Sequence, residues 1–205
     1  MSLAGFSEYL RFVVTLTAVL DPFLAVPIFV GVTVGRSAAG RAQLARAVTL
    51  TVFLVLAGAA LFGETALQLL GTSLAAFRVG GGLVLLLMAL AMLSAQVGAL
   101  RQTEAEAAEL EARDVSGVVP LAVPLLAGPG AISTSIIAAQ AGGAAHVALI
   151  VGCIALVCAL LWSMLTLAQA IGRRMGTTGL NIATRILGLL LAAIAIETID
   201  RKSVV

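Results

Sequence analysis

Apolar residues run along this chain in long blocks that are separated by short polar connections. Each of six blocks is long enough for a membrane-spanning helix, which needs about 17–25 residues. The first block has Glu8 as well as Arg11 at its start, so it lacks the basic flank of a signal peptide and is interpreted as a span. The pattern predicts an all-α membrane protein. Its predicted spans are Tyr9–Val32, Leu44–Phe62, Phe77–Val97, Val118–Gln140, Val147–Ile171 and Ile182–Ile199.

One connection is longer than the others and differs in composition. Arg101–Asp114 is rich in Ala and Glu, which favour helix, so we expect a solvated surface helix there. Docking of a partner on this helix is the less favoured alternative. The chain then divides into a first three-helix repeat over 1–100, a cytoplasmic linker helix over 101–117 and a second three-helix repeat over 118–205.

Two of the apolar blocks are interrupted near their middle by a pair of prolines. One pair lies in Asp21–Pro27 and the other in Pro124–Gly130. Proline within a helix removes a backbone hydrogen bond and clashes with the preceding turn. Broken backbone inside a membrane survives only where protein covers it or where it lines a cavity. We therefore predict that the first and fourth spans are discontinuous and that a transporter binding site lies at the breaks.

The two halves of the chain share further features in the same order. Arg78-Val79-Gly80-Gly81 opens the third span, and Arg185-Ile186-Leu187-Gly188 opens the sixth. Three spans per half is an odd number, so the second half would enter the membrane from the opposite side. The sequence therefore predicts six transmembrane helices arranged as a 3+3 inverted repeat, with the substrate site at the repeat interface near the midplane.

The residues at each break have the form of a helix start. Asp21 is a favoured N-cap and Pro22 is favoured at the first helical position, and Gly128-Pro129 has the same form. The second half-helices would leave the midplane in opposite directions, so their N-termini would face one another. Each N-terminus carries free N–H groups and about half a positive charge. Two such ends suit a carboxylate, and carbonyls before each break suit an ammonium or a cation, which together describe an amino acid.

Candidate substrate-binding residues surround the two breaks. For the hydroxyl groups among them, the competing interpretation is that they only donate to carbonyls of their own helices. Asp21 is the only acidic residue well inside a span, and an intramembrane charge costs at least ~2.5–3.5 kcal/mol on insertion scales. It is therefore the candidate for proton or sodium coupling, or a cap for the second half-helix, or both. The candidates are Thr15, Thr17, Asp21, Pro22, Leu24, Ala25, Pro27, Gly128, Pro129, Gly130, Ser133 and Thr134.

Composition excludes several classes of function. Hydrophobic residues make up 61% of the chain and charged residues 11%, against roughly 45–50% and 25% in soluble domains. A net charge of +2 gives no basic face for nucleic acid. The sequence contains no zinc pattern, nucleophile elbow or phosphate-binding loop, so we expect no enzyme, no metal and no cofactor beyond a coupling ion. His146, in a short loop, is expected to be solvated, and Glu197, at the end of a span, to be exposed.

Basic residues are distributed unevenly between the two sides that this topology predicts. One side has eight and the other has four, so the positive-inside rule places the first side in the cytoplasm. We expect a multi-pass protein of the inner (plasma) membrane with both termini outside the cytoplasm. The first side holds Arg36, Arg41, Arg46, Arg101, Arg113, Arg173, Arg174 and Arg185, and the second holds Arg11, Arg78, Arg201 and Lys202.

Three stretches of the chain resemble the MarC/SnatA family of membrane proteins. They are Asp21-Pro22 followed by Pro27-Ile28-Phe29, the long run Val119–Ile132, and Thr184–Leu190. The resemblance implies transport of small neutral amino acids such as glycine and alanine, with ion or proton coupling. It also implies discontinuous first and fourth spans. The family commonly has Gly-Asn where this chain has Leu24-Ala25, and a more apolar pocket favouring a larger aliphatic amino acid is a hypothesis that follows.

Three functions remain open on the sequence. A secondary transporter of small neutral amino acids is the first interpretation. The alternatives are an exporter of other small metabolites or drugs, and a non-transporting membrane scaffold. The substrate, the direction of transport, the coupling ion and the choice between a monomer and a homodimer are left open.

Overall fold

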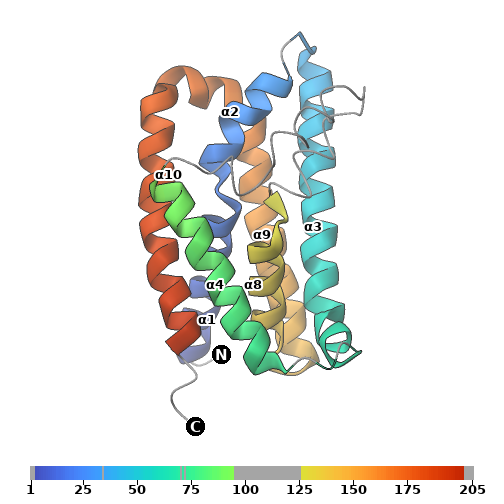
Figure 1. Ribbon diagram of the computed structural model, residues 1–205. Coiled ribbons are helices and arrows are strands. Elements are labelled where there is room, and N and C mark those ends of the chain that lie inside the picture. Colours follow the sequence, from blue (N-terminus) through green and yellow to red (C-terminus); the bar gives the residue numbers. More distant parts are fainter. Residues whose placement is uncertain (1–2, 34, 70, 72, 95–125, 201–205) are drawn as a thin grey trace.

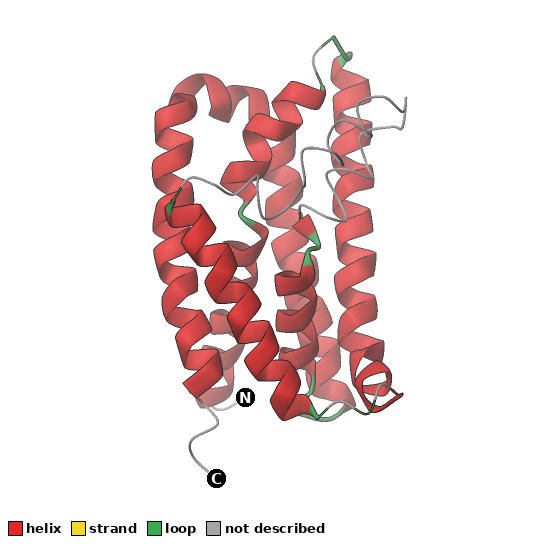
Figure 2. Ribbon diagram, viewed as in Figure 1, coloured by secondary structure: helices red, strands yellow, loops and turns green. Residues whose placement is uncertain are grey.

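The computed structural model describes residues 3–33, 35–69, 71, 73–94 and 126–200. Within these ranges the chain is helical and has no strand, as Figures 1 and 2 show. The predicted linker helix over 101–117 and the prolines Pro120 and Pro124 lie outside the described residues. The helices are α1 (Leu3–Leu20), α2 (Pro22–Val32), α3 (Ala38–Leu69), α4 (Leu74–Leu93), α8 (Pro129–Ala139), α9 (Ala144–Thr166) and α10 (Ala168–Asp200).

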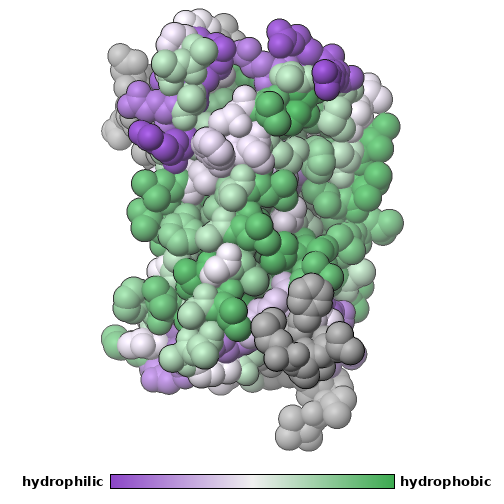
Figure 3. All heavy atoms as spheres, turned by 180° about the vertical axis from the view of Figure 1, so that it is seen from behind, coloured by the Kyte–Doolittle hydropathy of each residue, from purple (hydrophilic) through white to green (hydrophobic). Residues whose placement is uncertain are grey.

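Most of these helices are long and apolar enough to cross a membrane. The described residues hold five such spans, and α8 is a shorter apolar helix. On the face seen in Figure 3, hydrophobic residues fill the middle of the molecule between more hydrophilic ends. The chain is thus an integral membrane protein. The fourth predicted span is described only from Leu126, so the six-span inverted repeat stays a prediction. The five spans are Ser7–Val32, Ala38–Leu69, Ala75–Leu93, Ala144–Thr166 and Thr178–Asp200.

Helices α4 and α10 pack closely along each other because glycine removes side chains from their contact. A Cβ added at Gly188 of α10 would lie 2.8 Å from Met92 Cβ and 3.2 Å from the carbonyl oxygen of Ala89. A Cβ at Gly82 of α4 would lie 2.5 Å from Cγ1 of Ile199. Small residues let membrane helices approach at backbone distance. The two contacts show that α4 and α10 run antiparallel, as Figure 1 also shows.

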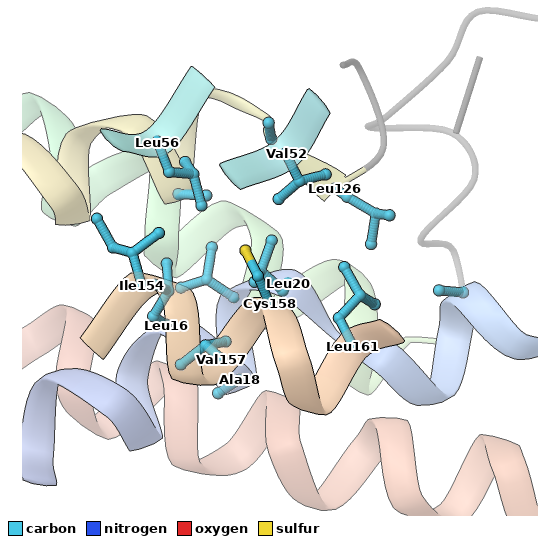
Figure 4. Packing of buried hydrophobic residues seen from close by; sticks show 14 of the residues in the cluster. Leu16, Ala18, Leu20, Val52, Leu56, Leu126, Ile154, Val157, Cys158 and Leu161 are labelled. Carbon is cyan, nitrogen blue, oxygen red and sulfur yellow. The ribbon is translucent and has the colours of Figure 1, made fainter. Parts of the chain in front are cut away.

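The apolar core joins α1, α3 and α9, together with the residues just before α8. Figure 4 shows these side chains pointing toward one another. All of them are almost completely inaccessible to solvent, so the part of the bundle formed by these described residues is closed. The most buried include Leu16, Leu20, Val52, Leu56, Leu126, Ile154 and Leu161.

The boundary between the last two spans differs from the prediction. The apolar pattern predicted a fifth span through Ile171, but α9 ends at Thr166 and Leu167 caps it. Helix α10 begins at Ala168 and kinks at Gly176, whose φ of 62° and ψ of 179° favour a residue without a Cβ. The stretch before this kink lies across the end of the bundle opposite the termini (Figure 1). Hydropathy does not reveal this turn because the residues on both sides of it are apolar.

Candidate functional site

The first break consists of a single residue. Asp21 stands between α1 and α2 with φ 43° and ψ 71°, in the left-handed region that L-residues other than Asn and Asp rarely adopt. Its Oδ1 accepts a hydrogen bond from the N–H of Leu24 at 3.2 Å, and Pro22 occupies the first turn of α2. Asp21 is thus the N-cap that the sequence predicts. Pro27 lies inside α2 and does not end the helix.

A residue that the sequence analysis did not select lies beside this cap. Asp21 is fully buried, and the buried hydroxyl of Thr184 on α10 donates to the same Oδ1 at 3.4 Å. The contact joins the last helix to the break in the first span. A hydroxyl residue inside an apolar span was the available signal, since Thr184 opens one of the stretches that carry the family resemblance.

The second break has the same backbone form without a side-chain cap. Gly128 is the extended N-cap of α8 and Pro129 occupies its first turn. A Cβ at Gly130 would lie 2.7 Å from Met88 Sδ and 3.5 Å from Val19 Cγ1. The start of α8 therefore lies against α4 and against the last turn of α1, close to the first break. From there α2 and α8 run toward opposite ends of the bundle (Figure 1), as expected of the two half-helices.

The hydroxyl groups near the breaks donate within their own helices. Each predicted candidate bonds to a carbonyl about one turn earlier, as the competing interpretation held. The oxygen atoms keep lone pairs that can accept a further hydrogen bond. Contact with a ligand stays a prediction for all of them. The bonds are Thr15 to the Arg11 carbonyl at 2.8 Å, Thr17 to Val13 at 2.7 Å, and Ser133 and Thr134 to Gly130 at 3.1 and 2.7 Å.

A cavity of about 160 Å³ lies between α1, α4, α8 and α10, at the end of the bundle that holds both termini. Thr15 and Thr134 are the only candidate residues in its wall. The other candidates at the breaks do not line it, so this cavity lies to one side of the predicted site. These others are Thr17, Asp21, Pro22, Leu24, Ala25, Pro27, Gly128, Pro129, Gly130 and Ser133.

A second cavity, of about 370 Å³, lies toward the opposite end and is lined by Pro27, Arg173 and Gly176 among others. The first span therefore borders one cavity at Thr15 and another at Pro27. The stretch between them is closed, with several side chains at most 1% exposed. These are Leu16, Ala18, Val19, Leu20, Asp21, Ala25 and Val26.

Opposite charges meet at the wall of the smaller cavity. Arg11 on α1 forms an ion pair with Glu197 on α10, and Glu8 also lines the space. The side chains of the pair are 39% and 45% exposed. Glu197 is partly exposed as expected, but sequence reasoning gave no indication that it pairs with a residue near the start of the chain.

His146 is half-buried and bonded on both sides, so the expectation that it is merely solvated is wrong. Its Nε2 lies 2.9 Å from the carbonyl oxygen of Ala138, and its Nδ1 lies 2.8 Å from the hydroxyl oxygen of Tyr9. A carbonyl only accepts, so Nε2–H donates to it and Nδ1 accepts from the tyrosine. The ring thereby connects α1, α8 and α9 at the terminus end.

The described residues offer no cluster that suits a metal ion. No group of three or more His, Cys, Asp or Glu side chains comes together in this part of the chain. Cys153 and Cys158 on α9 are free thiols. The chemistry of the described structure therefore centres on the two breaks, the smaller cavity and its ion pair.

Comparison with known proteins identifies relatives over nearly the whole chain. The model of the "MarC family integral membrane protein" matches residues 6–201. UPF0056 membrane protein YhcE of Escherichia coli is 36% identical over 195 residues, which cover 95% of this chain and 91% of that protein. YvbG of Bacillus subtilis is 35% identical, with 95% and 93% covered, and a Methanocaldococcus jannaschii protein is 37% identical, with 89% of both covered. No solved structure matches the chain significantly.

Proposed function

Since the chain belongs to the MarC family of integral membrane proteins, we propose that it is a secondary transporter of small neutral amino acids such as glycine and alanine. A proton or sodium gradient would drive it. The observation that carries the proposal is the pair of half-helices, α2 and α8. They begin close together inside the bundle and run toward opposite ends. Paired discontinuous helices of this kind form the substrate sites of many transporters.

The two half-helix starts differ in a way that orients a zwitterion. Asp21 already places a carboxylate at the start of α2, where it accepts the N–H of Leu24. Gly128 supplies no side chain to the start of α8. The positive end of α8 is therefore the better place for a substrate carboxylate, and the Asp21 carboxylate is the better partner for an ammonium. A zwitterion between them would meet opposite charges at its two ends.

The closed middle supports a carrier rather than a channel. One cavity borders the first span at Thr15 and another borders it at Pro27, with buried side chains between them. A substrate could pass only if the bundle opened to each side in turn. The buried carboxylate of Asp21 is the group best placed to take up a coupling proton or sodium ion. An intramembrane charge is costly, so residues that carry one usually have a function.

Charge supports the proposed orientation. Exposed basic side chains gather at the end of the bundle opposite the termini, in the α2–α3 connection, the start of α3 and the first part of α10. The positive-inside rule would place this end in the cytoplasm and both termini outside it, in the plasma membrane. The exposed basic residues in these segments are Arg36, Arg46, Arg173 and Arg174, whereas Arg185, which the sequence analysis counted on the same side, is exposed next to Thr184 at the level of the first break.

Uptake into proteoliposomes tests the proposal. Labelled glycine, alanine and leucine would be offered under an imposed proton or sodium gradient to the wild type, to Asp21→Asn and to Glu64→Gln. Asn keeps the cap and tolerates the left-handed backbone, so Asp21→Asn removes the charge at little cost to the fold. Glu64 is exposed on α3, so Glu64→Gln controls for the loss of one carboxylate.

We expect gradient-driven accumulation of glycine and alanine by the wild type and the control, and its loss in Asp21→Asn. Accumulation by Asp21→Asn equal to that of the wild type would show that Asp21 only caps α2 and takes no part in ion coupling. Absence of all uptake by the folded wild type would refute amino acid transport and favour an exporter of other solutes or a scaffold. Leucine taken up in preference to glycine would support the hypothesis of a larger substrate, although Leu24 and Ala25 do not line the smaller cavity.

A further inference from the structure

The smaller cavity brings together charges that come from the two ends of the chain. Arg11 and Glu197 pair across the space between α1 and α10, and Glu8 contributes a further carboxylate to the wall. None of these residues belongs to the helix breaks. The cavity is therefore separate in its chemistry from the site at Asp21 and Gly128.

We propose that this cavity is a binding site for free zwitterionic amino acids, in which Arg11 holds the carboxylate and Glu197 holds the ammonium. The ligand takes the place of the contact that the two side chains make with each other. If the protein transports amino acids, a substrate would bind at this site before it reaches the closed middle of the bundle, and this part of the inference rests on the proposed function. The binding chemistry itself does not.

The ion pair is suited to exchange. Both side chains are close to half exposed, and ion pairs in such surroundings are weak because water competes for both partners. A zwitterion returns an opposite charge to each partner, so neither is left unpaired. A simple anion or a simple cation satisfies only one of them. The guanidinium group of Arg11 can also meet a carboxylate with two parallel hydrogen bonds.

The rest of the wall fits the ammonium end of the ligand. The hydroxyl hydrogens of Thr15 and Thr134 are donated to carbonyls in their own helices. Their oxygen atoms therefore offer acceptors, which suit an ammonium and do not suit a carboxylate. Most of the remaining surface is apolar. It comes from Phe12, Leu85, Ile137, Ala138 and Ile194.

The size of the cavity limits the ligand to small members of this class. Its volume of about 160 Å³ is well below the roughly 300–1,000 Å³ of pockets that hold drug-sized molecules. Glycine and alanine are the amino acids best matched to a space of this volume. The site therefore selects for a pair of opposite charges in a small molecule.

Equilibrium binding of labelled glycine to the purified full chain in detergent tests the inference. Competition with alanine, acetate and ethylamine needs no variant, because acetate and ethylamine each carry only one of the two charges. We expect alanine to compete well, and each singly charged compound to compete at least about tenfold more weakly, since each leaves one charged partner unpaired.

Variants of Arg11 and Glu197 then test whether each side chain contributes to glycine binding. Arg11→Gln and Glu197→Gln should each weaken glycine binding by about tenfold or more, whereas Arg11→Lys keeps the charge but loses the two parallel hydrogen bonds, so its affinity should lie between those of the wild type and Arg11→Gln. Arg36→Gln and Glu64→Gln make the same changes at exposed positions outside the cavity and should bind like the wild type. The midpoint of thermal unfolding of each variant shows that it is folded.

Glycine affinity unchanged in folded Arg11→Gln and Glu197→Gln would overturn the assignment. Acetate or ethylamine competing as well as alanine in the wild type would overturn the selection for a zwitterion. A wild type that binds glycine in this way but accumulates none in proteoliposomes would uphold this site and refute the transport proposal. Accumulation of glycine by the wild type, together with a glycine affinity that is unchanged in Arg11→Gln and Glu197→Gln, would uphold the transport proposal and overturn this site.

Discussion

The left-handed residue between α1 and α2 allows a strict test of how the break is held. Three replacements of Asp21, by Asn, Gly and Ala, all remove the same buried charge. The effect of that charge on the free energy of unfolding therefore cancels when the variants are compared with one another. What remains is the cap to the N–H of Leu24, the hydrogen bond from the Thr184 hydroxyl and the backbone conformation with φ 43°.

The structure sets the size of the difference. Alanine cannot cap, which costs about 1 kcal/mol, and its Cβ disfavours the left-handed backbone by roughly 1–2 kcal/mol. Asparagine caps as well as aspartate and tolerates this backbone. Alanine also loses the hydrogen bond from Thr184, worth about 1 kcal/mol, so Asp21→Ala should be less stable than Asp21→Asn by about 3–4 kcal/mol. Asp21→Gly should lie between them, because glycine adopts positive φ freely but loses more entropy on folding.

Unfolding of the purified variants by a rising mole fraction of sodium dodecyl sulfate, followed by far-ultraviolet circular dichroism, measures these differences. Glu64→Ala, at an exposed position, should stay within about 0.5 kcal/mol of the wild type. Equal stability of Asp21→Ala and Asp21→Asn would refute the reasoning, because neither the cap nor the left-handed backbone would then contribute.

Three further predictions concern contacts between helices, measured by the same unfolding assay. Gly188→Ala should be about 1–3 kcal/mol less stable than Gly80→Ala, because a Cβ at Gly188 meets another Cβ at 2.8 Å, while nothing lies within 4 Å of one at Gly80. Equal stability of the two variants would show that α4 and α10 can move apart to accommodate the added Cβ without measurable cost. Thr184→Val should cost about 1 kcal/mol by removing the donor to the buried carboxylate, and Thr184→Ser should recover most of it. Tyr9→Phe should cost about 0.5–1.5 kcal/mol by removing the bond to His146, and no loss would mean that water replaces it.

The local features of the breaks were predictable from the sequence. Asp21-Pro22 and Gly128-Pro129 begin helices, as the sequence predicts, because capping depends on atoms within three or four positions of the cap. The sequence predicts that the starts of α2 and α8 face one another, but the packing of α8 against the last turn of α1 was found only in the structure. The predicted first half of the fourth span and the linker helix lie outside the described residues, so they stay predictions.

Contacts between distant parts of the chain were not predictable in the same way. Thr184 and Asp21 are 163 positions apart, and Tyr9 and His146 are 137 apart. No local pattern states which face of one helix meets which face of another. The role of each glycine could not be predicted from the sequence either. A Cβ at Gly80 would meet open space, whereas one at Gly82 would contact the end of α10. Which glycine is needed depends on how the two helices are aligned.

The single-residue break also has a mechanical consequence. Because only Asp21 separates α1 from α2, the two halves of the first span can change their relative direction mainly through one pair of backbone torsions. Helix α2 has 11 residues and is therefore about 16 Å long. A rotation of roughly 10° at its base would move its far end by about 3 Å. Asp21, which we propose takes up the coupling ion, is therefore also the hinge residue from which α2 extends to the end of the bundle opposite the termini.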